Sequence, residues 1–104
     1  MPMQEIDRIK DCFVAALHPR RIYLFGSFAS GTACADSDFD FYIVVDNERK
    51  NWHALTTDAY RCIRAVRSRP VDILVGTEDD FNERRIRNTI EKEVAENGVL
   101  IYAA

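Results

Sequence analysis

The chain has 104 residues, of which 47% are hydrophobic and 30% charged, and it contains only four Gly and three Pro. This composition is typical of one compact globular domain and excludes a disordered or fibrous chain. The formal net charge of −3 gives no electrostatic reason for binding a long nucleic acid. The sequence therefore predicts a single domain over residues 1–104.

The cysteines and the N-terminal segment indicate the cellular compartment. Cys12, Cys34 and Cys62 are odd in number and widely spaced, so neither a disulfide framework nor a zinc site is expected. Residues 1–10 mix acidic and basic side chains, unlike a signal peptide, and no apolar run is long enough to span a membrane. We expect a cytoplasmic protein with reduced thiols and no membrane partner.

The first half of the chain predicts one helix and two strands. Apolar residues at helical spacing indicate an amphipathic helix over residues 3–17. Residues 21–25 (RIYLF) are rich in β-branched and aromatic types and predict a buried strand. A small polar loop over residues 27–34 follows, and residues 39–45 (FDFYIVV) predict a central strand.

The second half predicts two helices, each followed by a strand. An apolar stripe indicates a long helix over residues 52–66, and residues 71–75 (VDILV) predict a third strand. A hydroxyl cap at Thr77 and three acidic residues after it favour a second helix, which Gly98 ends. Residues 99–102 predict a last strand. The apolar face of the second helix is expected to contain Ile86, Ile90 and Val94.

This alternation of elements, in the order αβ(α)βαβαβ, predicts the fold class. Helices would cover a small mixed sheet in an α/β (α+β) fold. No repeat, low-complexity segment or linker interrupts the order.

One glycine, one serine and two acidic residues have a spacing that indicates a chemical site. Gly26-Ser27 follow the first strand, and Asp38-Phe39-Asp40 come after ten intervening residues. Because alternate residues of a strand share a face, Asp38 and Asp40 are expected to project together. Such carboxylates repel each other unless a cation lies between them, and oxygen-only ligands select Mg²⁺ or Mn²⁺. The pattern therefore predicts a metal site for a phosphate-bearing substrate.

Asp72 is a candidate for the same site. It interrupts an otherwise apolar strand, and a buried carboxylate needs a compensating partner or metal. Gly26 would permit close backbone approach, and Ser27 would hold phosphate oxygens through its hydroxyl and neighbouring N–H groups. An exposed edge position, or pairing with an arginine, is the plainer interpretation of Asp72.

Plainer interpretations also exist for other residues. A surface turn with a solvated acidic loop would explain residues 26–40, although four spaced positions between two strands favour the site. The arginines at helical spacing favour a solvated helix face, with contact to a triphosphate or an acidic partner as the alternative. These arginines are Arg61, Arg64 and Arg67.

The aromatic residues and histidines are expected to be structural. Trp52, Tyr60 and Phe81 should cover the core, although an exposed one could anchor a partner. His18 and His53 have no suitably spaced companion for metal binding or acid–base work.

Three segments carry a resemblance to a known family. Residues 26–31 (GSFASG), 36–40 (DSDFD) and 71–74 (VDIL) resemble the minimal nucleotidyltransferases of the polymerase-β-like superfamily. Residues 90–102 (IEKEVAENGVLIY) are similar to the end of that family. The resemblance spans most of the chain and implies the polymerase-β-like nucleotidyltransferase fold.

The resemblance implies transfer of a nucleoside monophosphate from an NTP, most simply AMP from ATP, with loss of pyrophosphate. Asp38 and Asp40 would hold two Mg²⁺ ions, as in other two-metal sites. Asp72 would complete the catalytic and metal-binding set and help to activate an acceptor hydroxyl. Gly26 and Ser27 would bind the nucleotide.

One departure from the family concerns Ser30, which stands where members often carry Arg. The grip on the triphosphate would weaken unless another Arg substitutes. Because the catalytic core takes up the whole chain, the acceptor would come from outside, and the resemblance makes a HEPN-domain ribonuclease toxin the first candidate. The chain would then be an antitoxin. The alternatives are a catalytically silent antitoxin, and transfer to a small molecule such as an aminoglycoside.

Overall fold

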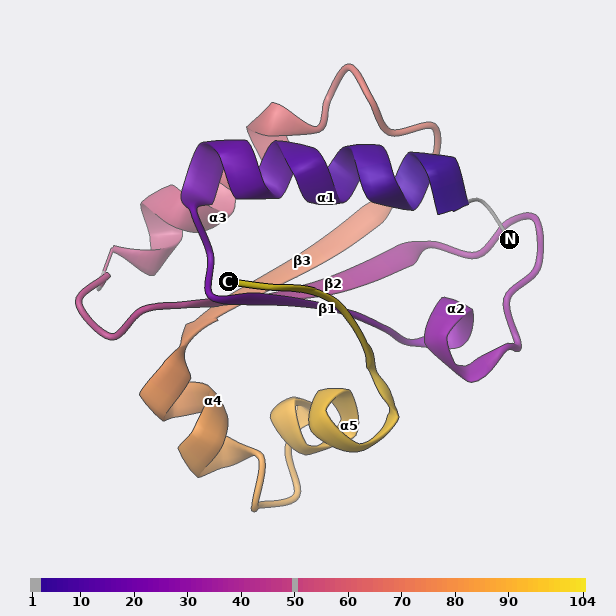
Figure 1. Cartoon of the computed structure of the whole chain (residues 1–104). Helices are drawn as coiled ribbons and strands as arrows, with labels where there is room; N and C mark the ends of the chain where they lie inside the picture. Colours follow the sequence, from indigo (N-terminus) through magenta and orange to yellow (C-terminus); the bar gives the residue numbers. More distant parts are fainter. Residues whose placement is uncertain (1–2, 50) are drawn as a thin grey trace.

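The computed structural model describes residues 3–49 and 51–104, which form a four-stranded sheet with helices on both faces (Figure 1). The strand order is β3-β2-β1-β4, with β2 parallel to β3 and the other neighbouring pairs antiparallel. This arrangement confirms the predicted α/β (α+β) class. The strands are β1 (Arg21–Phe25), β2 (Phe39–Val45), β3 (Val71–Thr77) and β4 (Val99–Ala103).

The helices form two layers. Helices α1 and α3 lie on one face of the sheet, and α4 and α5 lie on the other (Figure 1). The short α2 follows β1 at one end of the sheet (Figure 1). The helices are α1 (Met3–Leu17), α2 (Ser27–Ser30), α3 (Trp52–Cys62), α4 (Glu78–Arg84) and α5 (Ile90–Asn97).

Strand β2 lies at the centre of the core, and its side chains alternate between the two layers. Phe41 packs edge-on against Phe13 of α1, with ring centroids 5.3 Å apart. Tyr42 packs against Phe81 of α4 on the opposite face, at 5.1 Å. Every residue of β2 is buried except Asp40, which is half-buried. Asp40 therefore lies where neither helical layer fully covers the sheet.

The C-terminal helix predicted as one element is two helices, α4 and α5, separated by a turn. The cause is a second N-cap at Thr89. Its hydroxyl accepts a hydrogen bond from a backbone N–H of α5 (3.3 Å) and donates one to the carbonyl of Arg84 (2.6 Å). Val94 is buried as predicted, whereas Ile86 and Ile90, expected on the same face, are 80% and 42% exposed.

Helix α3 ends at Cys62 and does not continue to Val66 as predicted. The backbone turns more tightly after the helix, and the N–H of Val66 donates to the carbonyl of Ile63 (3.0 Å). Ile63 stays buried in this turn. The helical spacing of apolar residues in the sequence therefore extends beyond the end of the helix itself.

Only one of the three aromatic residues predicted to cover the core does so. Phe81 is fully buried, whereas Trp52 and Tyr60 are 51% and 39% exposed. The hydroxyl of Tyr60 instead accepts a hydrogen bond from the N–H of Ile73 (2.9 Å) and protects the edge of β3.

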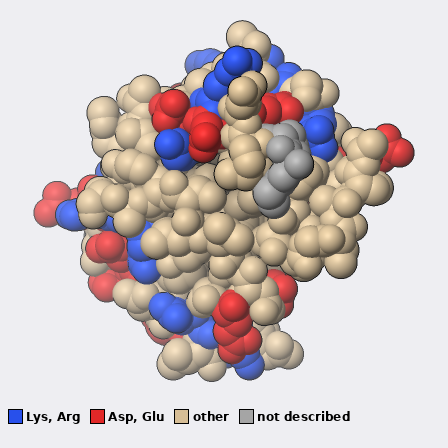
Figure 2. All heavy atoms as spheres, turned by 45° about the vertical axis from the view of Figure 1, so that its right-hand side comes forward, with Lys and Arg blue, Asp and Glu red and all other residues tan. Residues whose placement is uncertain are grey.

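The surface is mixed in charge. Figure 2 shows acidic and basic side chains interspersed around a band without charged residues, on the face nearest α2.

The two histidines are exposed, all three cysteines are free thiols, and the described residues include no helix that could cross a bilayer. The three arginines expected on a solvated face are exposed, as predicted: Arg61, Arg64 and Arg67.

Phe81→Ala should lower the free energy of unfolding by about 3–5 kcal/mol, because it empties a fully buried position between Tyr23 and Tyr42. Ile86→Ala in the adjoining turn is the control and should change stability by less than about 0.5 kcal/mol. Urea denaturation measures both variants. Similar costs for the two would contradict the division into α4 and α5.

Candidate active site

The turn after β1 brings the backbone directly against a carboxylate. Gly26 has φ of 75°, a conformation that favours glycine. A Cβ atom here would lie 2.3 Å from Oδ2 of Asp40, which is far closer than atoms can approach. The β1–β2 register, which pairs Phe25 with Asp40, creates this proximity. The backbone at Gly26 therefore approaches the Asp40 carboxylate closely, whereas the predicted approach to a phosphate stays a prediction.

Ser27 opens the four-residue helix α2, and Ser30 ends it. The hydroxyl of Ser30 donates to the carbonyl of Ser27 (3.3 Å) and lies 2.9 Å from the hydroxyl of Thr32. At the position where the resembling family often carries Arg, this chain therefore has a short side chain bonded within its own loop. Ser30 supplies no positive charge to the site.

Asp40 and Asp72 lie side by side on neighbouring strands. The parallel register of β2 and β3 pairs them directly, so both side chains project from the same face. Asp72 is exposed, because β3 is an edge strand. The expectation that Asp72 is buried is therefore wrong and the alternative of an exposed edge position is confirmed, although the structure does bring Asp72 to Asp40.

The pKa of Asp40 reports how crowded this site is. Burial raises it most, followed by the negative charges of Asp72 and Asp38 and by a hydrogen bond shared with Asp72, and together they bring the pKa to about 6. The carboxylates of Asp38 and Asp72 thus both raise the pKa of the third predicted carboxylate, Asp40. At a pH below 6 a proton relieves the repulsion, and a divalent cation can relieve it at higher pH.

These residues fit a divalent cation. Within residues 3–49 and 51–104, no three His, Cys, Asp or Glu side chains already stand in the arrangement of a complete metal site. The oxygen ligands of Asp40 and Asp72 are nevertheless adjacent, and Asp38 is within electrostatic range. Such a set suits Mg²⁺, which takes one or two protein carboxylates and completes its shell with substrate phosphates and water.

A cavity of about 520 Å³ lies near the C-terminal ends of β2 and β3. None of the candidate site residues lines it, and the lining residue nearest to them along β2 is Tyr42, two positions after Asp40 on the same face. The cavity mixes aromatic, polar and charged groups. Its lining is Tyr42, Asn47, Arg49, Trp52, Val75, Gly76, Thr77, Asp79, Asp80, Arg84 and Glu91.

Sequence reasoning missed the polar cluster that supports this cavity. The Tyr42 hydroxyl donates to buried Glu91 (2.8 Å), and Nε of Arg84 donates to the other oxygen of that carboxylate (3.0 Å). Burial alone would raise the pKa of Glu91, but these two hydrogen bonds, a backbone hydrogen bond and the positive charge of Arg84 together outweigh it and lower the pKa. Gly76 leaves room for Tyr42, since a Cβ would lie 2.5 Å from the hydroxyl. The three-residue spacing of Glu91 and buried Val94 on α5 was the available signal.

Asp40→Asn should stabilise the metal-free protein by about 1 kcal/mol at pH 7.5. The rise in pKa from 3.8 to about 6 corresponds to about 3 kcal/mol, which solvent screening at this half-exposed site reduces to about 1 kcal/mol. The folded protein binds the Asp40 proton more tightly than the unfolded chain does. The stabilisation that this proton gives to the folded state is therefore complete below pH 4, and it is lost as the pH rises through 6.

Urea denaturation in EDTA at pH 4 and pH 7.5 measures this effect. Wild type and Asp40→Asn should converge at the lower pH and separate at the higher one. Equal free energies of unfolding for wild type and Asp40→Asn at both pH values would show that burial and carboxylate repulsion do not raise the pKa of Asp40 as described.

Known proteins were compared with this chain in sequence and in structure. Residues 7–104 match the family model described as polymerase beta, nucleotidyltransferase. A Sulfolobus solfataricus protein described as a nucleotidyltransferase is 20% identical, with a TM-score of 0.67, over 96% of this chain and 78% of its own. No curated protein sequence gives a significant match.

Two toxin–antitoxin structures are also similar. One, with AMP-PNP, is 17% identical with a TM-score of 0.59, over 100% of this chain and 75% of its own. The other is a mutant of the MntA–HpeT pair, 17% identical with a TM-score of 0.67, over 94% of this chain and 73% of its own. These likenesses show a shared fold, and the family model covers nearly the whole sequence. The chain therefore belongs to the polymerase β nucleotidyltransferase family.

Proposed function

We propose that this protein is a Mg²⁺-dependent nucleotidyltransferase that transfers a nucleoside monophosphate, most simply AMP from ATP, to a hydroxyl of a partner protein. The observation that carries the proposal is the pairing of Asp40 with Asp72 beside Gly26, with Asp38 in electrostatic range. The similar toxin–antitoxin structure with AMP-PNP supports an adenine nucleotide as the donor.

The three carboxylates have different surroundings, which supports different roles. Half-buried Asp40 lies at the centre of the charge cluster, so with Asp38 it would hold the metal ions. Asp72 is exposed on an edge strand, where an acceptor from outside the chain can reach it. Bound Mg²⁺ would neutralise the charge that develops on the phosphates during transfer.

The reaction is a substitution at the α-phosphorus. The acceptor hydroxyl oxygen attacks the α-phosphorus, and the bond between this phosphorus and the oxygen that bridges to the β-phosphate breaks. Pyrophosphate is the leaving group. The carboxylate of Asp72 takes the proton of the attacking hydroxyl. The protein mainly contributes position and charge.

The loop after β1 would hold the phosphates of the donor. The N–H groups of Ala29 and Ser30 both donate to the carbonyl of Gly26. Phosphate contact would therefore fall to the Ser27 hydroxyl and to the N–H groups at the start of α2. The cavity beyond Tyr42, roughly 7 Å along the strand from the acidic site, would have room for the nucleoside.

The acceptor is proposed to be the toxin of a toxin–antitoxin pair, with a HEPN-domain ribonuclease as the first candidate. Two similar solved structures are toxin–antitoxin complexes, which supports an antitoxin role. Exposed Asp72 suits a protein side-chain hydroxyl as well as a small molecule.

Ser30 supports a second candidate, a catalytically silent antitoxin that acts by contact alone. Because Ser30 bonds within its own loop, the position gives no cation to the triphosphate. Binding to the partner would then persist without transfer.

Asp38→Asn and Asp40→Asn should each lower nucleotide transfer on the order of 100-fold or more, because each removes a carboxylate that would hold the Mg²⁺ ions, whose positive charge would stabilise the transition state. Asp36→Asn, in the exposed part of the same loop, is the matched control and should retain transfer. Intact mass of this protein and the product of the neighbouring gene, after incubation with Mg²⁺ and each NTP in turn, detects added nucleotide units.

The outcome also separates the two candidates. A mass gain on the partner that the two variants lose would support the enzyme and identify donor and acceptor together. A stable complex without a mass gain for any NTP would contradict transfer and favour the silent antitoxin.

A further inference from the structure

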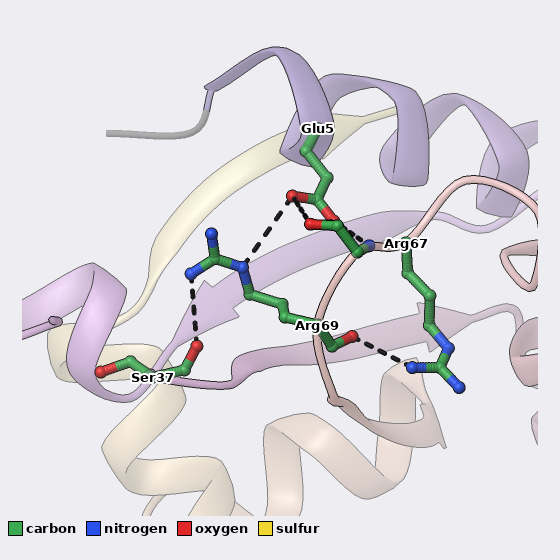
Figure 3. Close-up of polar contacts among 5 residues, drawn as sticks. Glu5, Ser37, Arg67 and Arg69 are labelled. Carbon is green, nitrogen blue, oxygen red and sulfur yellow. Dashed lines mark hydrogen bonds and ion pairs between the residues drawn. The ribbon is translucent and has the colours of Figure 1, made fainter. Parts of the chain in front are cut away.

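Arg69 connects three separate elements behind the acidic site (Figure 3). Its Nη1 donates to the backbone carbonyl of Ser37 (3.4 Å), and its Nε lies 3.9 Å from the carboxylate of Glu5 on α1. The guanidinium carbon is 5.2 Å from the ring centroid of Phe28 and 4.7 Å from that of Phe39. A side chain only 22% exposed thus holds the segment before β3 against α1, α2 and the start of β2.

The groups that Arg69 contacts are chain neighbours of the candidate site residues. Ser37 and Phe39 flank Asp38, and Phe28 follows Ser27. Arg69 itself lies three residues before Asp72. One side chain therefore touches the chain beside the predicted phosphate-binding residue and on both sides of a predicted metal ligand.

Arg69 is itself held in place from α1. The Glu5 carboxylate accepts hydrogen bonds from the backbone N–H of Ser68 (2.5 Å) and from its hydroxyl (2.8 and 2.9 Å). Arg67 donates to the carbonyl of Arg69 (3.2 Å). Figure 3 shows these contacts around the turn that carries Arg69. They fix the backbone from which the guanidinium group extends.

The loop that carries Asp38 depends on such support. Ladder pairing of β2 with β3 begins at Phe39, whose N–H donates to the carbonyl of Pro70 (3.2 Å). Asp38 lies just before this point, and Ser37 is otherwise bonded to Cys34 within the loop. The Arg69–Ser37 bond therefore ties the loop to the rest of the domain immediately before the ligand.

We propose that Arg69 is a positioning residue that holds the Asp38 loop in the geometry required to bind the metal–nucleotide. The inference rests on the proposed function. Arg69 acts through contacts with the loop, because its guanidinium faces Glu5 and two aromatic rings. Lysine cannot reproduce it fully, since an ammonium group lacks the planar face and the fork of donors.

Binding of Mn²⁺, used as a spin probe in place of Mg²⁺, tests this proposal by electron paramagnetic resonance with AMP-PNP present. Arg69→Met should weaken Mn²⁺ binding roughly 10- to 100-fold, as loss of a supporting residue typically does. Arg69→Lys and Glu5→Gln should lie between Arg69→Met and wild type. Arg64→Met, which removes the same charge from the exposed turn after α3, should stay within about twofold of wild type.

Circular dichroism melting in EDTA separates positioning from loss of fold, with binding measured well below each melting temperature. If Arg69→Met does not fold, Arg69→Lys and Glu5→Gln decide the question. Wild-type Mn²⁺ affinity in both of these variants, or in Arg69→Met, would overturn the proposal. An Arg64→Met loss equal to that of Arg69→Met would overturn it as well, because a general charge effect would then suffice.

The same assay keeps this proposal distinct from the proposed function. If wild type binds Mn²⁺ and nucleotide but transfers nothing, and Arg69→Met weakens that binding, transfer fails while the role of Arg69 stands. If wild type binds no Mn²⁺ even with nucleotide, the metal site fails and the role of Arg69 fails with it.

Discussion

Repulsion between the carboxylates of Asp40 and Asp72 is the constraint on which the site depends. Parallel pairing of β2 with β3 fixes the two residues opposite each other, and the hydrophobic packing of β2 on both faces prevents the strands from separating. The repulsion is therefore not relieved by movement, and burial, the larger cause, and this repulsion together raise the pKa of Asp40 to about 6. A fold that holds like charges together in this way favours a cation, and through the cation a phosphate.

The surrounding residues keep this arrangement open to substrate. Gly26 removes the one Cβ that would collide with Asp40, and the edge position of β3 leaves Asp72 exposed. Buried Glu91 anchors Tyr42 at the wall of the cavity further along β2, and Arg69 supports the loop from the other side of the sheet. Stability and function are thus coupled, because the side chains that hold the strands also shape the site.

The sequence predicted the sheet and the grouping of the acidic residues, because both follow from local patterns. A nearly continuous apolar run predicted β2, and Asp38, which lies just before β2 begins at Phe39, is still within electrostatic range of Asp40. The break at Thr89 could not be predicted in the same way, and the exposure of Asp72 could be given only as an alternative to its burial. The break depends on the Thr89 hydroxyl, which caps a new helix instead of allowing α4 to continue. The exposure of Asp72 depends on which strand lies at the edge of the sheet. The contacts of Arg69 with Glu5 and Ser37 join positions far apart in the chain, so spacing gave no sign of them.

A titration of the Asp40 carboxyl carbon by NMR, with and without Mg²⁺ and AMP-PNP, measures directly how strongly the site favours a cation. We expect a pKa of about 6 in the free protein and a clear decrease when the metal–nucleotide is added. A pKa near the ordinary value of 3.8 in the free protein, unchanged by the metal–nucleotide, would contradict this expectation.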